Sequence, residues 1–144
     1  THVEWHYLWE GLNALSEDKR ALYVQRARDY VLKTSEALSR GEVPSEMCPL
    51  NDEGKCGVYE HRMMICRMYG VPNFLLGRSG LRDFPGCPAC MELIGGREHE
   101  RVDRTGLYRE LAQLELDFLG SRRNQAPKVD MTLAEMILAG PPKP

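Results

Sequence analysis

Apolar residues recur at helical spacing in the first part of the chain. Over residues 2–14 they follow one another at intervals of two to four, and this pattern predicts a short amphipathic helix. Ser16 precedes two acidic residues, an arrangement typical of a helix N-terminus. Apolar positions then continue at helical spacing as far as Gly41, so the longest helix is expected over 17–40.

The same spacing returns in the C-terminal part of the chain. Leucines and a phenylalanine three or four positions apart predict a helix over 102–119. A polar linker is expected over 121–129. A last short helix, which Asp130 or Thr132 can cap, should then extend through Ala139.

The middle of the chain is rich in turn-forming residues. Glycines, prolines and short polar residues dominate 42–57 and 71–98, and both segments are expected to be loops. Between them, residues 58–69 support a helix that Gly70 and Pro72 would end. The predicted fold is therefore mostly α, with four to five helices around an irregular, cysteine-rich centre.

Length and composition narrow the class of protein. A chain of 144 residues corresponds to one domain, here with a helical arm (2–40), a cysteine-rich core (42–98) and C-terminal helices (102–139). Its 42% hydrophobic and 28% charged residues are typical of a soluble globular protein. The formal net charge of -2 argues against binding to nucleic acid or to an anionic membrane. No apolar run approaches the roughly 18 to 20 residues of a membrane span.

Five cysteines are the unusual feature of this composition. An odd number cannot pair off into disulfides, and no signal-peptide core is found, so reduced thiols in the cytoplasm are expected. Because the chain starts at Thr1, a secretory origin stays open. Loops of this composition bury little apolar area, and a structural metal would stabilise them by on the order of 10 kcal/mol. The cysteines all lie in the middle of the chain, at Cys48, Cys56, Cys66, Cys87 and Cys90.

The spacing of the cysteines is C-x7-C-x9-C-x20-C-x2-C. The last pair, Cys87 and Cys90, forms a C-x2-C turn of the kind that brings two sulfurs onto one metal or cluster. Two alternatives do not need a metal. The five thiols could each be buried independently in the core. A thioredoxin-like dithiol would require a strand before the C-x2-C turn, where the sequence GRSGLRDFPG predicts a loop.

The segment 48–70 resembles a known family. It reads CPL, then GKCGVYE, then HRMMICRMYG, and it is similar to the core of the YkgJ-type cysteine-cluster family, which is described as a zinc- or iron-chelating domain. The resemblance implies metal ligation by Cys48, Cys56 and Cys66. Two elements differ, since the upstream C-x-x-C-C of that family is missing and Met63 stands where that family has a proline.

We expect Cys87 and Cys90 to replace some of the missing ligands, so that four of the five cysteines bind. Zinc sites are most recognisable from two C-x2-C pairs, whereas iron–sulfur clusters accept irregular spacing because their ligands attach to separate iron atoms. The expected cofactor is a 4Fe-4S cluster, with zinc as the alternative. Arg62 and Arg67 flank Cys66 and would offset the thiolate charge; alternatively, both lie on the solvated face of a helix.

The histidines are weaker ligand candidates. His2 and His6 stand four residues apart on a predicted helix, but near a terminus they are expected to be surface or packing residues. His61 could complete a mixed site if one cysteine is not a ligand. No phosphate-binding loop and no dinucleotide-binding motif is found.

The sequence thus predicts a small, cysteine-ligated metalloprotein rather than a catalyst, and no catalytic residue is assigned. An iron–sulfur protein with an electron-transfer, redox-sensing or metal-handling role is the main hypothesis. The alternative is a structural zinc domain that binds a partner protein, with Trp5 and Trp9 as the docking residues.

Overall fold

The computed structural model describes residues 1–77 and 79–142. It is 55% helical, which confirms the mostly α prediction, and the described residues form six α-helices where four to five were expected. The helices are α1 (His2–Asn13), α2 (Glu17–Ser39), α3 (Met64–Met68), α4 (Pro88–Ile94), α5 (Thr105–Leu119) and α6 (Leu133–Ala139), with 3-10 helices η1 (Tyr59–His61) and η2 (Gly120–Asn124). The strands are β1 (Asn51–Asp52), β2 (Lys55–Cys56), β3 (Asn73–Gly77), β4 (Gly80–Phe84) and β5 (Val102–Asp103).

The chain divides into two compact units, whereas the sequence indicated a single domain. Unit 1 comprises residues 1–61 and 127–144, and unit 2 comprises residues 62–126. Unit 2 is therefore an insertion in the sequence of unit 1. Cys48 and Cys56 belong to unit 1, and the other three cysteines belong to unit 2.

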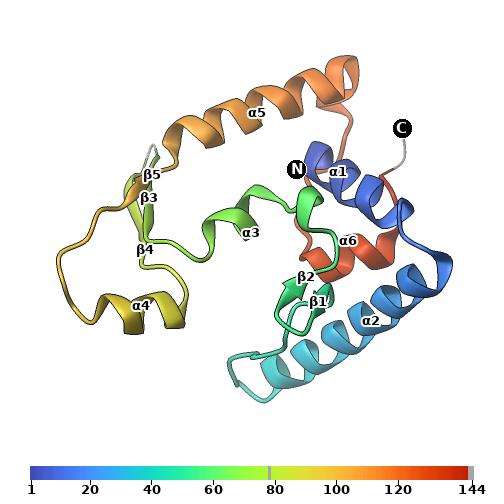
Figure 1. Cartoon of the computed structure of the whole chain (residues 1–144). Coiled ribbons are helices and arrows are strands. Elements are labelled where there is room, and N and C mark those ends of the chain that lie inside the picture. The colour runs from blue at the N-terminus through green and yellow to red at the C-terminus, as the bar shows by residue number, and fades with distance from the viewer. Residues whose placement is uncertain (78, 143–144) are drawn as a thin grey trace. The chain divides into compact units, whose positions relative to one another are not determined.

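Three helices, α1, α2 and α6, build unit 1 (Figure 1). Their boundaries agree closely with the predictions over 2–14, 17–40 and the C-terminal short helix. The caps explain this agreement, because the side chain of Ser16 accepts a hydrogen bond from the backbone N–H of Lys19 at the start of α2. Thr132 and Glu135 form a complete capping box at the start of α6. The core of unit 1 contains the fully buried side chains of Leu8, Leu12, Tyr23 and Ile137.

Two tryptophans of α1 hold the C-terminal end of α6. The indole N–H of Trp9 donates to the carbonyl of Met136 at 2.9 Å, and that of Trp5 donates to the carbonyl of Gly140 at 2.8 Å. Helix C-termini carry carbonyls without intrahelical partners, and these indoles satisfy them. The indole N–H groups of both tryptophans are thus engaged within unit 1, and the docking role expected for Trp5 and Trp9 stays a prediction.

A tight hairpin lies in the segment that was expected to be a loop over 42–57. β1 pairs with β2 in antiparallel register, with Asn51 opposite Cys56. The two connecting residues, Glu53 and Gly54, both have positive φ, of 52° and 87°. This is the turn geometry that matches the natural twist of a two-residue hairpin.

Unit 2 contains a three-stranded sheet that the sequence did not predict. The loop prediction over 71–98 is wrong there, since β3 and β4 form an antiparallel hairpin and α4 follows it. β5 adds in parallel to the other edge of β3, giving the order β4-β3-β5. Apolar residues of β3 suit a strand, but its pairing partner β5 begins 25 positions after β3 ends, beyond the reach of a local pattern.

The helix predicted over 58–69 is broken in the middle. Residues 59–61 form η1 and residues 64–68 form α3, while Met63 between them is extended, with φ of -62° and ψ of 156°. The Arg62 guanidinium reaches forward to the Cys66 carbonyl across this break. The linker expected over 121–129 is also partly helical, since η2 occupies its beginning. Among the described residues, no helix has the length and apolarity needed to cross a membrane.

Candidate metal centre

All five cysteines are thiols outside the hydrophobic core. Cys48 is exposed, and the other four are partly exposed. The alternative of five independently buried core thiols is therefore wrong. Each cysteine lies next to a turn or a helix end rather than at a buried periodic position of a long helix.

In unit 1, one local structure positions both cysteines. The backbone N–H of Asn51 donates to the carbonyl of Cys48 at 3.0 Å, which closes a turn directly before the hairpin. Asn51 is also the register partner of Cys56. Cys48 and Cys56 therefore both lie at the open end of the β1–β2 hairpin, although seven residues separate them in the sequence.

Buried and charged side chains of α2 anchor this hairpin. The hydroxyl of Tyr23 donates to the carboxylate of Asp52 at 2.5 Å, and the Lys19 ammonium and the Arg26 guanidinium lie 2.6 and 2.7 Å from the same carboxylate. These three hydrogen bonds, from Lys19 first, hold the pKa of Asp52 well below its usual range. Burial, the hydrogen bond to Asp52 and its negative charge raise the pKa of Tyr23 to about 12, and the charge of nearby Cys56 acts in the same direction.

Gly57 allows this anchor to approach the cysteine hairpin. A Cβ atom at position 57 would overlap the Tyr23 hydroxyl and would lie 2.5 Å from the ring carbon Cζ. Gly57 directly follows Cys56, and its N–H donates to the carbonyl of the buried Leu50 at 2.8 Å. A residue with a side chain cannot occupy this position without moving Tyr23 or the hairpin.

In unit 2, Cys66 lies on α3 between the two arginines that were expected to offset thiolate charge. The Arg62 guanidinium donates to the carbonyl of Cys66, and the Arg67 side chain donates to the carbonyl of Arg62 at 3.1 Å. Both arginines thus donate to backbone carbonyls of this segment. They fix the conformation around Cys66.

Cys87 and Cys90 lie at the start of α4, directly after a strand. Cys87 is the N-cap residue of α4, and Pro88 occupies its first position, a preferred place for proline. β4 ends at Phe84, so the expectation of a loop before this pair is wrong. Gly86 has a φ of 94°, and a Cβ there would lie 3.4 Å from the sulfur of Cys90 and 3.2 Å from the carbonyl carbon of Val71.

A buried cation near this pair was missed by the sequence analysis. Arg104 is only 2% exposed, and its guanidinium lies 3.7 Å from the ring centroid of Phe84 and 4.9 Å from that of Tyr108. The Nε of Arg104 and the Oδ1 of buried Asn73 have no hydrogen-bond partner within the described part of the chain. Only the non-local sheet pairing brings Arg104 over Phe84, so no local signal could have indicated it.

The histidines take packing and surface roles, in line with the weaker expectation for them. The ring of His61 stacks at 4.7 Å from Tyr7, and its Cβ lies against Gly11 of α1. His6 lies 3.5 Å from Glu10 on the surface of the same helix. His61 therefore serves the packing of η1 on α1.

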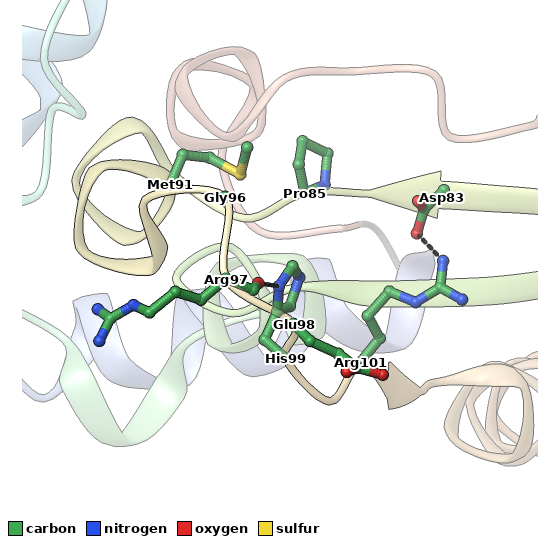
Figure 2. A pocket seen from close by; sticks show the side chains of 8 residues that line it. All are labelled: Asp83, Pro85, Met91, Gly96, Arg97, Glu98, His99 and Arg101. Atoms are coloured by element: carbon green, nitrogen blue, oxygen red, sulfur yellow. Dashed lines mark hydrogen bonds and ion pairs between the residues drawn. The ribbon is translucent and has the colours of Figure 1, made fainter.

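A wide, shallow pocket of about 570 Å³ lies beside β4 and α4 in unit 2 (Figure 2). Arg101 crosses it to pair with Asp83 at 3.0 Å, and His99 contacts the carbonyl of Arg97 at 3.0 Å. Figure 2 shows the guanidinium of Arg97 directed away from these side chains. The lining carries both acidic and basic side chains, and the pocket therefore presents no cluster of one sign.

The donor chemistry fits a thiophilic metal, but the arrangement is incomplete. Among residues 1–77 and 79–142, no group of three or more His, Cys, Asp or Glu side chains is placed to hold a metal ion. Unit 1 carries two cysteines and unit 2 carries three, so neither alone carries the four thiolates of a complete cluster or zinc site. No family model, curated protein or solved structure matches this chain.

Proposed function

We propose that this chain is a small metal-binding protein whose cysteine thiolates are the ligands. The observation that supports it is the position of the thiols, because all five lie outside the buried core. Partly exposed thiols beside turns and helix ends are accessible to a metal. Thiolate ligands of this kind would be available in a reducing cytoplasm, where we place the protein.

A 4Fe-4S cluster is the first candidate for the bound group, with zinc as the alternative. The two local pairs, Cys48 with Cys56 and Cys87 with Cys90, differ in spacing, and only the second is the short knuckle typical of zinc sites. Ligands of a cluster attach to separate iron atoms and tolerate such unequal spacing. An iron–sulfur centre would give the protein an electron-transfer, redox-sensing or metal-handling role, whereas a zinc centre would favour a structural role with a partner protein.

Metal analysis of protein purified without oxygen tests this proposal. An iron–sulfur protein should be brown, with broad absorption near about 400 nm that bleaches on reduction, and should contain iron and sulfide. A colourless protein with one zinc per chain would show that the bound metal is zinc rather than an iron–sulfur cluster. A protein that takes up neither metal, while its circular dichroism shows the expected helix content, would refute the function.

Single Cys→Ser variants test the ligand set. Cys48, Cys56 and Cys66, the three cysteines of the family resemblance, should each be required for full metal content, and one of the five should be dispensable. Met91→Leu is the matched control, since it alters a sulfur-containing side chain next to Cys90 that is not expected to bind. Full loading after the loss of any of the first three cysteines would contradict the assignment.

A further inference from the structure

Cys87 and Cys90 have a second use that does not depend on metal. Cys87 caps α4 and Cys90 is its third residue, so the two Cα atoms are separated by one helical turn, roughly 5 Å. Disulfides join Cα atoms about 4.4 to 6.8 Å apart. Both thiols are partly exposed. The backbone therefore already holds the pair at a separation that one disulfide bond can span.

The two thiols have different surroundings. The sulfur of Cys90 lies 3.4 Å from the Cβ position of Gly86, and that position is 3.2 and 3.3 Å from backbone atoms of Val71 and Pro72. The sulfur of Cys90 thus faces the bend at Gly86, close to the segment that precedes β3. Cys87 makes no side-chain capping hydrogen bond to α4, so its sulfur is not held by the helix. We therefore assign Cys87 as the attacking thiol and Cys90 as the resolving thiol.

The support of the pair is rigid. The pair follows β4, which forms a hairpin with β3 through five paired residues. Pro88 restricts the backbone between the two cysteines. Gly86 at a φ of 94° makes the sharp bend from the strand to the helix. A dithiol held in this way loses little conformational freedom when the disulfide forms, which favours an intramolecular bond over two separate adducts.

We propose that Cys87 and Cys90 form a reversible dithiol–disulfide couple that exchanges with small-molecule disulfides. The thiolate of Cys87 attacks one sulfur of the disulfide RSSR, which breaks the S–S bond and releases RS⁻. The thiolate of Cys90 then attacks the sulfur of Cys87 in this mixed disulfide and releases the second RS⁻. In total, two protein thiols and one RSSR give one protein disulfide and two RSH, and the protein loses the two electrons that RSSR gains.

This inference goes beyond the proposed function, because it holds whether or not a metal binds. The same two sulfurs are candidate metal ligands, and a sulfur in the disulfide no longer provides a thiolate ligand. The test therefore uses the full chain after treatment with a chelator. Its outcome and the metal analysis above are then independent of each other.

Tryptic mapping separates the Cys87–Cys90 pair from the other three cysteines, each of which falls in a peptide of its own. Cleavage after Arg82 and Arg97 places Cys87 and Cys90 in one peptide, residues 83–97, while the other three cysteines fall in peptides 41–55, 56–62 and 63–67. The chain is equilibrated with glutathione buffers of increasing disulfide content, quenched in acid and alkylated. In the reduced chain both cysteines of peptide 83–97 are alkylated. In the oxidised chain neither is alkylated, and the mass of the peptide is two hydrogens below that of its dithiol form. This change should occur at a lower disulfide content than modifies the other peptides.

Two variants test the order of attack. Cys90→Ser should accumulate glutathione on Cys87, because the resolving thiol is gone, whereas Cys87→Ser should be modified at least several-fold more slowly at Cys90. Met91→Leu should behave as the unmodified chain. The proposal is overturned if peptide 83–97 stays doubly alkylated throughout the series, if it carries only glutathione adducts, or if either cysteine pairs instead with a cysteine of another peptide.

Discussion

The hydroxyl of Tyr23 donates a hydrogen bond of 2.5 Å to the carboxylate of Asp52, 29 residues further along the chain. Tyr23 is fully buried on α2, and Asp52 belongs to the hairpin that carries Cys56. Lys19 and Arg26 pair with the same carboxylate. One contact point thus connects the longest helix to the cysteine hairpin of unit 1.

Removal of this hydroxyl should destabilise unit 1. Tyr23→Phe keeps the buried ring and deletes one hydrogen bond to a charged acceptor, for which we expect a loss of about 1.5–3 kcal/mol in the free energy of unfolding. Urea denaturation followed by circular dichroism measures it. Tyr30→Phe on the same helix is the control, since no hydrogen bond of the Tyr30 hydroxyl is found in the described part of the chain. Equal stabilities of the two variants would show that the contact with Asp52 contributes nothing.

The same pair predicts how stability changes at high pH. The pKa of Tyr23 is raised to about 12 in the folded chain, whereas an unfolded tyrosine titrates near about 10. Below pH of about 10 the hydroxyl is protonated in both states, so its contribution is complete. As the pH rises from about 10 to 12, the unfolded state loses the proton first and stability falls, by at most about 1.4 kcal/mol per pH unit. Y23F should lack this part of the alkaline decline, and an unchanged slope in Y23F would contradict the raised pKa.

At low pH the carboxylate of Asp52 should contribute to the loss of stability. Its folded pKa lies well below the ordinary value because three donors stabilise the charged form. The stabilisation is therefore present above the unfolded pKa of about 4 and is lost as the pH falls through and below it. Acid titration of Asp52→Asn should show a shallower loss than the unmodified chain. Asp130→Asn is the control, because Asp130 is 88% exposed and its nearest cation, Lys128, is 3.7 Å away.

A methyl group at position 57 should be costly. Gly57→Ala places a Cβ on the Tyr23 hydroxyl, and overpacking of this kind destabilises by about 1–3 kcal/mol. The matched control is Gly70→Ala, where a Cβ meets nothing within 4 Å and the effect should stay within about 0.5 kcal/mol. If Cys48 and Cys56 are ligands, Gly57→Ala should also lower metal content. Equal melting temperatures of the two variants would rule out the close approach.

The indole of Trp9 should stabilise α6 rather than bind a partner. Trp9→Phe keeps most of the buried ring and removes the donor to the Met136 carbonyl, so we expect a loss of about 1–2 kcal/mol. The effect is limited because Trp5 also donates to that carbonyl at 3.1 Å. Hydrogen exchange of the α6 amides locates the change. Unaltered protection of α6 in the variant would argue against this role.

The helices of unit 1 could be predicted because their signals are local. Ser16 and Thr132 cap helices whose apolar positions repeat every three or four residues, and these patterns lie within the helices themselves. The sheet of unit 2 could not be predicted in this way. Its central strand is flanked by glycines and prolines typical of loops, and it is completed by Val102 and Asp103 from a distant segment.

The candidate site shows the same difference between local features, which could be predicted, and non-local ones, which could not. Only the Cys87–Cys90 pair follows from its spacing. Cys48 and Cys56 are brought together by a turn and a hairpin in a segment that was expected to be a loop. The residues that hold these pairs in place are remote in sequence. Tyr23 reaches Asp52 across 29 positions, and Arg104 reaches Phe84 through the pairing of three strands. Whether the pairs bind metal stays a prediction.

The insertion of unit 2 into unit 1 has a consequence for the order of events during synthesis. Hydrogen bonds from Trp5 and Trp9 to the end of α6 join positions 127 to 135 residues apart, whereas unit 2 is one continuous stretch. Closing a longer loop costs more chain entropy, and a ribosome releases all of unit 2 before α6. Unit 2 should therefore fold on the nascent chain before α1 can pack against α6. During this interval Leu8 and Leu12 are exposed and can bind chaperones.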